Sequence, residues 1–277
     1  MRQFLLAILF AVAGVCGAYA QGFEVSPLAV EGDVPPGARV EIPIQISPTS
    51  IVDGRVLDIE VVQLAQSPNG AFNPVEYEPG SELPRSAAPW ITAPDQVVLE
   101  PREVSTLTLL MDVPLSARGA YAAGILLIAR PPEDAPGMRF TVRILVPIII
   151  GTEGRVVRQD VRLSDAQLRY RYPEAAADAS DAAPLPETTL VEAIIENRGG
   201  TYSRTVGDVW IDVADDGGNW RQVRRVDIAE RQLLPESSIT LPIDVGRLLP
   251  SGNYRIRGEL YVDGRRSAPL RREIAFE

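Results

Sequence analysis

The sequence contains no histidine and no lysine, and its only cysteine is Cys16. Histidine is the commonest general base and metal ligand, and cysteine and lysine supply the usual thiol and amine nucleophiles. A Ser–His–Asp or Cys–His arrangement is therefore excluded. Catalysis would depend on carboxylates, hydroxyls or arginine, and no spacing singles out a glycosidase-like pair among the 37 acidic residues. The sequence predicts a binding protein rather than an enzyme, with a carboxylate-dependent hydrolase as the remote alternative.

The first twenty residues have the three parts of a cleavable secretion signal. Arg2 supplies the positive start, and residues 4–15 form an apolar run of signal-peptide rather than membrane-spanning length. Ala18, Tyr19 and Ala20 then give an A-x-A cleavage site. We expect residues 1–20 to be removed and the mature chain to be periplasmic, with the cell surface as the alternative location.

Charge and hydropathy restrict the partners of the mature chain. All 27 basic residues are arginines and only Arg2 leaves with the signal, so 26 arginines remain against 37 acidic residues, a net charge of −11. This balance disfavours nucleic acid and anionic membrane surfaces. The next apolar stretch, Ile144 to Ile150, is far too short to span a bilayer. The expected partner is another exported protein, with no small-molecule cofactor, and the sequence leaves the oligomeric state open.

The apolar residues of the mature chain follow the period of β-strands. Apolar side chains alternate with other residues over 40–46, 57–61 and 105–113, and no segment shows a sustained helical period. Proline and glycine, 24 and 22 residues, interrupt these runs every eight to twelve positions, as in β-sandwiches. The sequence therefore predicts an all-β protein.

A repeated spacing indicates two related sandwiches. Tyr121 follows Pro101 by 20 positions and Tyr254 follows Pro235 by 19, and each tyrosine enters an apolar strand. Immunoglobulin-like sandwiches place a tyrosine corner at this point, where its hydroxyl ties down the preceding connection. We therefore predict two tandem immunoglobulin-like (Greek-key) β-sandwiches, at residues 21–151 and 152–277.

Two acidic segments interrupt the strands of the second domain. Residues 173–187 have almost no bulky apolar side chain, which predicts an acidic loop between the first two strands of this domain. Asp212, Asp215 and Asp216 lie in the second acidic segment, which spans 212–219, but their spacing does not match an EF-hand. The Asp-Asp-Gly-Gly-Asn run at 215–219 instead favours a hairpin turn, and no metal site is predicted. Calcium binding at this turn stays open.

The stretch from Phe140 to Ile150 is apolar on both faces, which has two interpretations. A buried central strand has this pattern. Pro147, however, cannot donate a hydrogen bond to a ladder and is expected at an edge or a bulge. An exposed apolar edge can pair with a strand of another protein. In that case Leu145 and Ile149 would face the partner, and Ile144, Val146 and Ile148 would belong to the core.

The first domain resembles the periplasmic fimbrial (pilus) chaperones, over about residues 23–151. The similar stretches are Phe23 to Pro27, Trp90-Ile91 with Val97 to Pro101, and Arg143 to Pro147. The resemblance implies two immunoglobulin-like domains whose cleft grips the carboxyl terminus of a pilus subunit. In that family one basic residue on the first strand and one on the last strand of domain one hold this carboxylate. Here the first strand has no Arg or Lys, and Arg143 lies about one residue from the expected register.

The run from Val97 to Ile128 is also similar to the peptidoglycan-binding-type domain of WxL surface proteins. The two resemblances suggest two non-catalytic functions. The first is a periplasmic chaperone-like protein that holds a partner strand, of a fimbrial or surface subunit, on an edge strand of domain one. The second is an envelope or cell-surface module that binds a polymer or another protein. For the first function the predicted binding residues are Arg143, Leu145 and Ile149, and Tyr121 and Tyr254 are predicted to be structural.

Overall fold

The protein is described from a computed structural model of the 277-residue chain. The structure describes residues 22–49, 54–131, 140–152, 157–172 and 187–277. Some sequence-based predictions lie outside these ranges. They are the secretion signal at 1–20 and nearly all of the acidic loop at 173–187.

The first part of the chain, from Phe23 to Thr152, folds into two sheets. One sheet has the strand order β1 (Phe23–Ser26), β3 (Arg39–Pro48), β8 (Ser105–Asp112) and β6 (Ile91–Thr92). The other has the order β2 (Val30–Asp33), β10 (Val142–Thr152), β9 (Gly119–Ala129), β4 (Arg55–Gln66) and β5 (Phe72–Glu76), and β7 (Gln96–Leu99) also pairs with β4. A short 3-10 helix, η1 (Ala88–Trp90), precedes β6.

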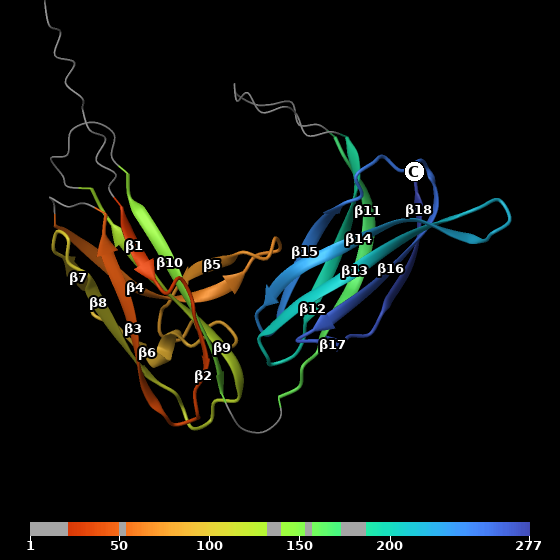
Figure 1. The fold of residues 1–277 in the computed structure, drawn as a ribbon. Helices are drawn as coiled ribbons and strands as arrows, with labels where there is room; N and C mark the ends of the chain where they lie inside the picture. Colours follow the sequence, from red (N-terminus) through yellow and green to blue (C-terminus); the bar gives the residue numbers. More distant parts are fainter. Residues whose placement is uncertain (1–21, 50–53, 132–139, 153–156, 173–186) are drawn as a thin grey trace, which may run out of the picture.

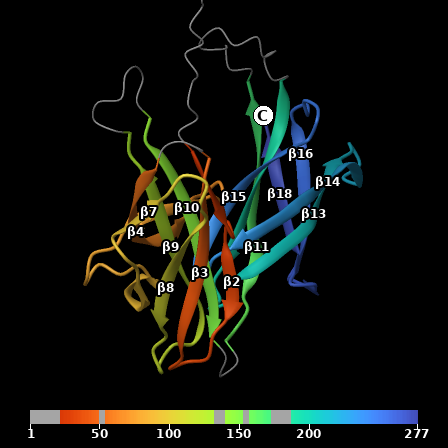
Figure 2. The ribbon, with the colours of Figure 1, turned by 60° about the vertical axis from the view of Figure 1, so that its left-hand side comes forward.

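The second part, from Val161 to Phe276, repeats this architecture. A three-stranded sheet has the order β11 (Val161–Arg171), β12 (Thr188–Asn197) and β15 (Ser237–Asp244). The facing sheet has the order β14 (Trp220–Leu233), β13 (Ser203–Ala214), β16 (Gly252–Val262) and β17 (Arg265–Arg266), and β18 (Leu270–Phe276) also pairs with β16. The two sandwiches lie side by side (Figures 1 and 2).

The strand order defines the class of both halves. In the first half β1, β3, β4, β8, β9 and β10 take the immunoglobulin positions A, B, C, E, F and G, because A, B and E share one sheet and C, F and G the other. In the second half β11, β12, β13, β15, β16 and β18 take the same positions. The prediction of two tandem immunoglobulin-like sandwiches is therefore confirmed.

Alternation along each strand creates a separate core in each sandwich. In β3, for example, Ile42, Ile44 and Ile46 are buried while Pro43 and Gln45 between them are exposed. Side chains of this kind from both sheets fill the space between the sheets, and no buried residue of the described ranges belongs to both main cores. Within the described ranges, no helix is long and apolar enough to cross a membrane.

The two predicted corner tyrosines begin strand F of each sandwich but make different hydrogen bonds. The Tyr254 side chain is 1% exposed, and its hydroxyl donates to the carbonyl of Pro250 at 2.8 Å. The Tyr121 hydroxyl instead accepts a long hydrogen bond, 3.4 Å, from the N–H of Arg118, and the Tyr121 ring packs on Trp90 with ring centroids 4.4 Å apart. The hydroxyl therefore ties down the preceding connection more tightly in the second sandwich than in the first.

Candidate partner-binding site

One half of β10 has an open edge. β10 pairs with β9 over its whole length, from Val142 to Thr152. On its other side β2 runs parallel to β10, but only Ile148 to Gly151 are paired with it. Among the residues that the structure describes, no strand lies beside Val142–Pro147 on that side. Pro147 stands at the end of this open segment, where the missing N–H costs no ladder hydrogen bond on the open side.

The two faces of β10 have different surroundings. Val146 and Ile148 are fully buried in the first core, and Ile144 packs partly against it. On the other face, half-buried Leu145 packs in a small apolar cluster outside the core, with Val62, Leu126 and Ile128. The alternation therefore places an apolar surface beside the open edge.

Gly124, on the neighbouring strand β9, lets the Leu145 side chain lie close to the sheet. A Cβ atom at Gly124 would come within 2.7 Å of Leu145 Cδ1. Any other residue at this position would push the leucine outward. The apolar surface therefore depends on a glycine.

Arg143 is the cation of the open edge. It lies on the same face as Leu145, is exposed, and makes no ion pair with any residue in the described parts of the chain. A guanidinium in this state can bind a partner's carboxylate without first breaking an internal pair.

Ile149, the third residue predicted to face a partner, is in a different environment. It is 3% exposed and lies in an apolar cluster that joins the two sandwiches and includes Leu64, Ala122 and Leu234. Its side chain is thus covered by residues of this chain. The sequence pattern correctly separated the two faces of β10, but it did not show that the second sandwich covers part of the outer face.

A polar cluster closes the junction beside Ile149. Glu31 of β2 is opposite Ile149 in the register, and its carboxylate accepts hydrogen bonds from Arg204 at 2.6 Å and from the Tyr202 hydroxyl at 3.2 Å. Burial of the phenol and the neighbouring Glu31 charge raise the pKa of Tyr202 well above its ordinary value. β2 therefore places an acid, Glu31, at this junction, and this acid is already paired with Arg204 of the second sandwich.

The turn between β4 and β5 also holds the second sandwich, toward which it points in Figure 1. The amide of Gln66 donates to the carbonyl of Gln232 at 2.7 Å and accepts from the N–H of Leu234 at 3.0 Å. The carbonyl of Pro68 accepts from the N–H of Thr240 at 2.6 Å. These bonds cross the junction through the main chain of the second sandwich, so they fix the relative position of the two halves.

Gln63 is a buried polar residue that the sequence reading missed. It is 1% exposed on the core-facing side of β4, and its amide donates to the carbonyls of Glu76 and Ser81 and accepts from the N–H of Leu83. The sequence did contain a signal. Every second residue of β4 from Leu57 onward points to the core, and Gln63 is the polar member of this otherwise apolar series. Gln63 thereby positions the loop that follows β5.

Residues 215–219 form the hairpin turn between β13 and β14, as predicted, whereas Asp212 lies within β13. The carboxylate of Asp215 accepts from the N–H groups of Gly217 and Asn219, which lowers the pKa of Asp215, chiefly through the bond from Asn219. Asp212 is buried and accepts from Arg255 at 2.6 Å and Arg257 at 2.8 Å. These two aspartates are therefore already engaged within the protein. The described residues contain no group of three or more acidic, histidine or cysteine side chains that could hold a metal ion.

Comparison with known proteins gave matches at the level of structure. No family model and no curated protein matched the sequence. The class 5 fimbriae chaperone CfaA has a TM-score of 0.44 and 11% sequence identity, covering 92% of this chain and 100% of that chain. A chain of the CsuC–CsuE chaperone–tip adhesion subunit complex from Acinetobacter baumannii has a TM-score of 0.43 and 13% identity, covering 91% and 98%. A chain of the Salmonella enterica SafA pilin complex with the SafB chaperone has a TM-score of 0.42 and 12% identity, covering 92% and 97%.

These solved structures are fimbrial chaperones or their complexes. The fold assignment itself stands on the strand order given above.

Proposed function

We propose that this chain is a non-catalytic, chaperone-like protein of the periplasm that holds a strand of another exported protein on β10. The observation that carries the proposal is the open edge at Val142–Pro147. It has an apolar surface beside it and a cation, Arg143, that forms no ion pair with any residue in the described ranges. The resemblance of the first domain to fimbrial chaperones suggests that the partner is a pilus or surface subunit.

The added strand would be short. Because β2 already occupies the side of Ile148–Gly151, the partner can pair only with the six residues from Val142 to Pro147. Main-chain hydrogen bonds would hold it, and about half of the main-chain groups of a strand point to each side. Every second partner side chain would lie on the face of Leu145, where an apolar residue extends the cluster with Val62 and Ile128.

Arg143 would add charge to this recognition. It lies two residues from Leu145 on the same face and is exposed, so it can meet an acidic side chain or a carboxyl terminus of the partner. A charge-assisted hydrogen bond of this type contributes about 1.5–3 kcal/mol to binding. The acid Glu31 cannot share this function, because its carboxylate is held by Arg204.

The test uses co-expression with the exported proteins encoded beside this gene, followed by purification of the complex. Leu145→Glu should reduce recovery of the partner about 30-fold, equivalent to ~2 kcal/mol, because a carboxylate would lie against the partner's apolar side chain. Arg143→Ala should reduce it about tenfold. Leu115→Glu, at a leucine that is 78% exposed and far from β10 in the sequence, is the matched control and should have no effect.

Two further measurements separate binding from folding. Ile148→Glu should unfold the first sandwich, because Ile148 is 0% exposed and the charge would be buried unpaired. Leu145→Glu should keep the two-sandwich fold, since its side chain can reach solvent along the open edge. In the wild-type complex those amides of residues 143–146 that point to the open side should gain hydrogen-exchange protection. Protection elsewhere, with none at these amides, would contradict strand addition on β10.

A further inference from the structure

The junction of the two sandwiches contains a cavity that strand addition on β10 does not use. Its volume is about 280 Å³, and it lies between the end of β4, a loop at 83–85, Ala122 of β9 and the turn at 234–238. All of these residues are within the described ranges. The cavity therefore belongs to both sandwiches.

The cavity exists because β4 separates from β9. Their pairing ends at Gln63 and Ala123, and β4 continues only with β5 as its partner. The loop enters the gap that this leaves, where the N–H of Ala122 donates to the carbonyl of Arg85 and the N–H of Ala87 donates to the carbonyl of Ala122. Buried Gln63 holds the start of this loop through the N–H of Leu83. Main-chain hydrogen bonds and Gln63 therefore fix the position of the loop that forms this wall of the cavity.

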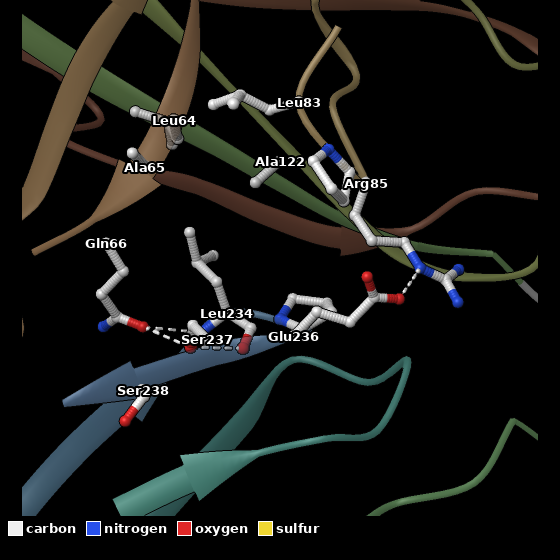
Figure 3. A pocket seen from close by; sticks show the side chains of 12 residues that line it. Leu64, Ala65, Gln66, Leu83, Arg85, Ala122, Leu234, Glu236, Ser237 and Ser238 are labelled. Atoms are coloured by element: carbon white, nitrogen blue, oxygen red, sulfur yellow. Dashed lines mark hydrogen bonds and ion pairs between the residues drawn. The ribbon is translucent and has the colours of Figure 1, made fainter.

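The cavity has an apolar middle and two polar ends (Figure 3). Leu64, Leu83 and Ala122 lie on one side, and Leu234 faces them from the second sandwich. At one end the amide of Gln66 is bound to the second sandwich. At the other end Arg85 donates through Nε to the Glu236 carboxylate at 3.2 Å. A bound ligand would therefore contact the apolar middle of the cavity and the charged residues at one of its ends.

The ion pair at that end is unusual in its backbone. Arg85 has a φ of 60° and Glu236 a φ of 58°, so both partners are non-glycine residues in the left-handed region. Each such residue costs about 1 kcal/mol or more, and residues of this kind concentrate at ligand sites. The Arg85 side chain is also fixed from behind, because it donates to the carbonyl of Arg118 and its guanidinium lies 5.4 Å from the centre of the Tyr121 ring.

The two charges differ in freedom. The side chain of Arg85 is 25% exposed and held by several contacts, whereas that of Glu236 is 47% exposed. Glu236 can therefore turn into solvent while Arg85 stays in place. An incoming anion would replace the Glu236 carboxylate on a prepared guanidinium, whereas an incoming cation would meet a fixed positive charge.

We propose that this cavity binds a small apolar carboxylic acid, with its carboxylate on Arg85 in place of Glu236 and its apolar group between Leu64, Ala122 and Leu234. The volume is just below the range of about 300–1,000 Å³ that is usual for ligand pockets, which fits an acid of five or six carbons better than a drug-sized molecule. A carboxylate next to an apolar group is present both in a small free acid and in an apolar residue at the carboxyl terminus of a polypeptide.

The test uses 4-methylpentanoate for the free acid and N-acetyl-L-leucine for the chain end, titrated into methyl-labelled full-length protein. Both probes should shift the methyl resonances of Leu64, Ala122 and Leu234, with dissociation constants of about 0.1–1 mM, as expected for so few atoms. N-acetyl-L-leucinamide, which has no carboxylate, should bind about tenfold more weakly or not at all. The probe with the lower dissociation constant indicates whether the natural ligand is a free acid or a carboxyl-terminal residue.

Three variants decide the site. Arg85→Ala should abolish binding, and Ala122→Leu should abolish it by filling the cavity while leaving the ion pair. Glu236→Gln should tighten binding about threefold or more, because the internal competitor becomes a weaker acceptor. Arg39→Ala, which breaks an exposed arginine–aspartate pair elsewhere, is the matched control and should leave binding unchanged.

The outcomes are distinct from those of strand addition. Persistence of binding in both Arg85→Ala and Ala122→Leu would overturn the proposal, as would the absence of shifts at 10 mM probe in both wild type and Glu236→Gln. Strand addition is unaffected by either result, because Arg85 and Ala122 do not line the open edge of β10.

Discussion

Replacement of Gln63 is expected to destabilise the first sandwich. The Gln63 side chain is 1% exposed and makes three hydrogen bonds to main-chain groups, the carbonyls of Glu76 and Ser81 and the N–H of Leu83, at 3.2, 3.1 and 2.6 Å. Gln63→Leu keeps approximately the same volume and removes all three bonds. The three groups that lose their partner lie in part-buried positions.

The magnitude follows from these bonds. A neutral hydrogen bond contributes about 1 kcal/mol net, and a buried group left unpaired costs about 1–3 kcal/mol. Because water can reach part of this loop, we expect the lower end, about 2–3 kcal/mol in total for Gln63→Leu. With a urea m-value of about 2 kcal/mol/M for a domain of this size, the unfolding midpoint should fall by about 1 M.

Two companion variants check the cause. Gln96→Leu removes an exposed glutamine whose bond goes only to Asp58, and it should change the free energy of unfolding by less than about 0.5 kcal/mol. Gln63→Glu keeps an acceptor for Leu83 but, when ionised, has no donor for the two carbonyls. Its destabilisation should therefore shrink as pH falls and the buried carboxyl gains a proton. A midpoint for Gln63→Leu within 0.2 M of wild type (roughly 0.4 kcal/mol at this m-value) would refute the assignment of these three bonds.

Two further predictions concern a buried aspartate of the second sandwich and the corner tyrosines of both sandwiches. Burial by itself would raise the pKa of Asp212, but the hydrogen bonds and charges of Arg257 and Arg255 outweigh it and hold the pKa below its ordinary value. The stabilisation is therefore present above the unfolded pKa of about 3.9 and is lost as pH falls through the folded pKa. Asp212→Asn should cost about 2 kcal/mol at pH 7 and should flatten the decline of stability below pH 4, measured by acid titration with circular dichroism. A decline in the variant parallel to that of the wild type would exclude Asp212 as its source. Tyr254→Phe should lower the free energy of unfolding by about 1–3 kcal/mol and Tyr121→Phe by less than about 0.5 kcal/mol, because of the two tyrosines only Tyr254 makes a short, buried hydrogen bond. Equal losses for the two variants in thermal unfolding would show that the two corners are equivalent.

The environments of the β10 side chains show which features of the candidate site the alternation of the sequence could predict. Alternation along 140–150 was sufficient to assign Val146 and Ile148 to the core and Leu145 to the opposite face, because the two faces of a strand differ by one residue. Pro147 likewise indicated an edge, and the edge in the structure ends at that residue. The pattern did not show that Ile149, on the same face as Leu145, is buried at the junction.

The sequence by itself determined the all-β class, the two sandwiches and the position of each corner tyrosine, because strand period, turn residues and repeated spacing are local properties of the chain. Only the tertiary structure decided which surfaces are covered. Glu31 meets Arg204, Gln66 meets Leu234 and Arg85 meets Glu236, each across more than 150 positions of the sequence. Periodicity states which way a side chain points from its own strand. What it then contacts depends on how two separately folded sandwiches pack together, and no local pattern records that.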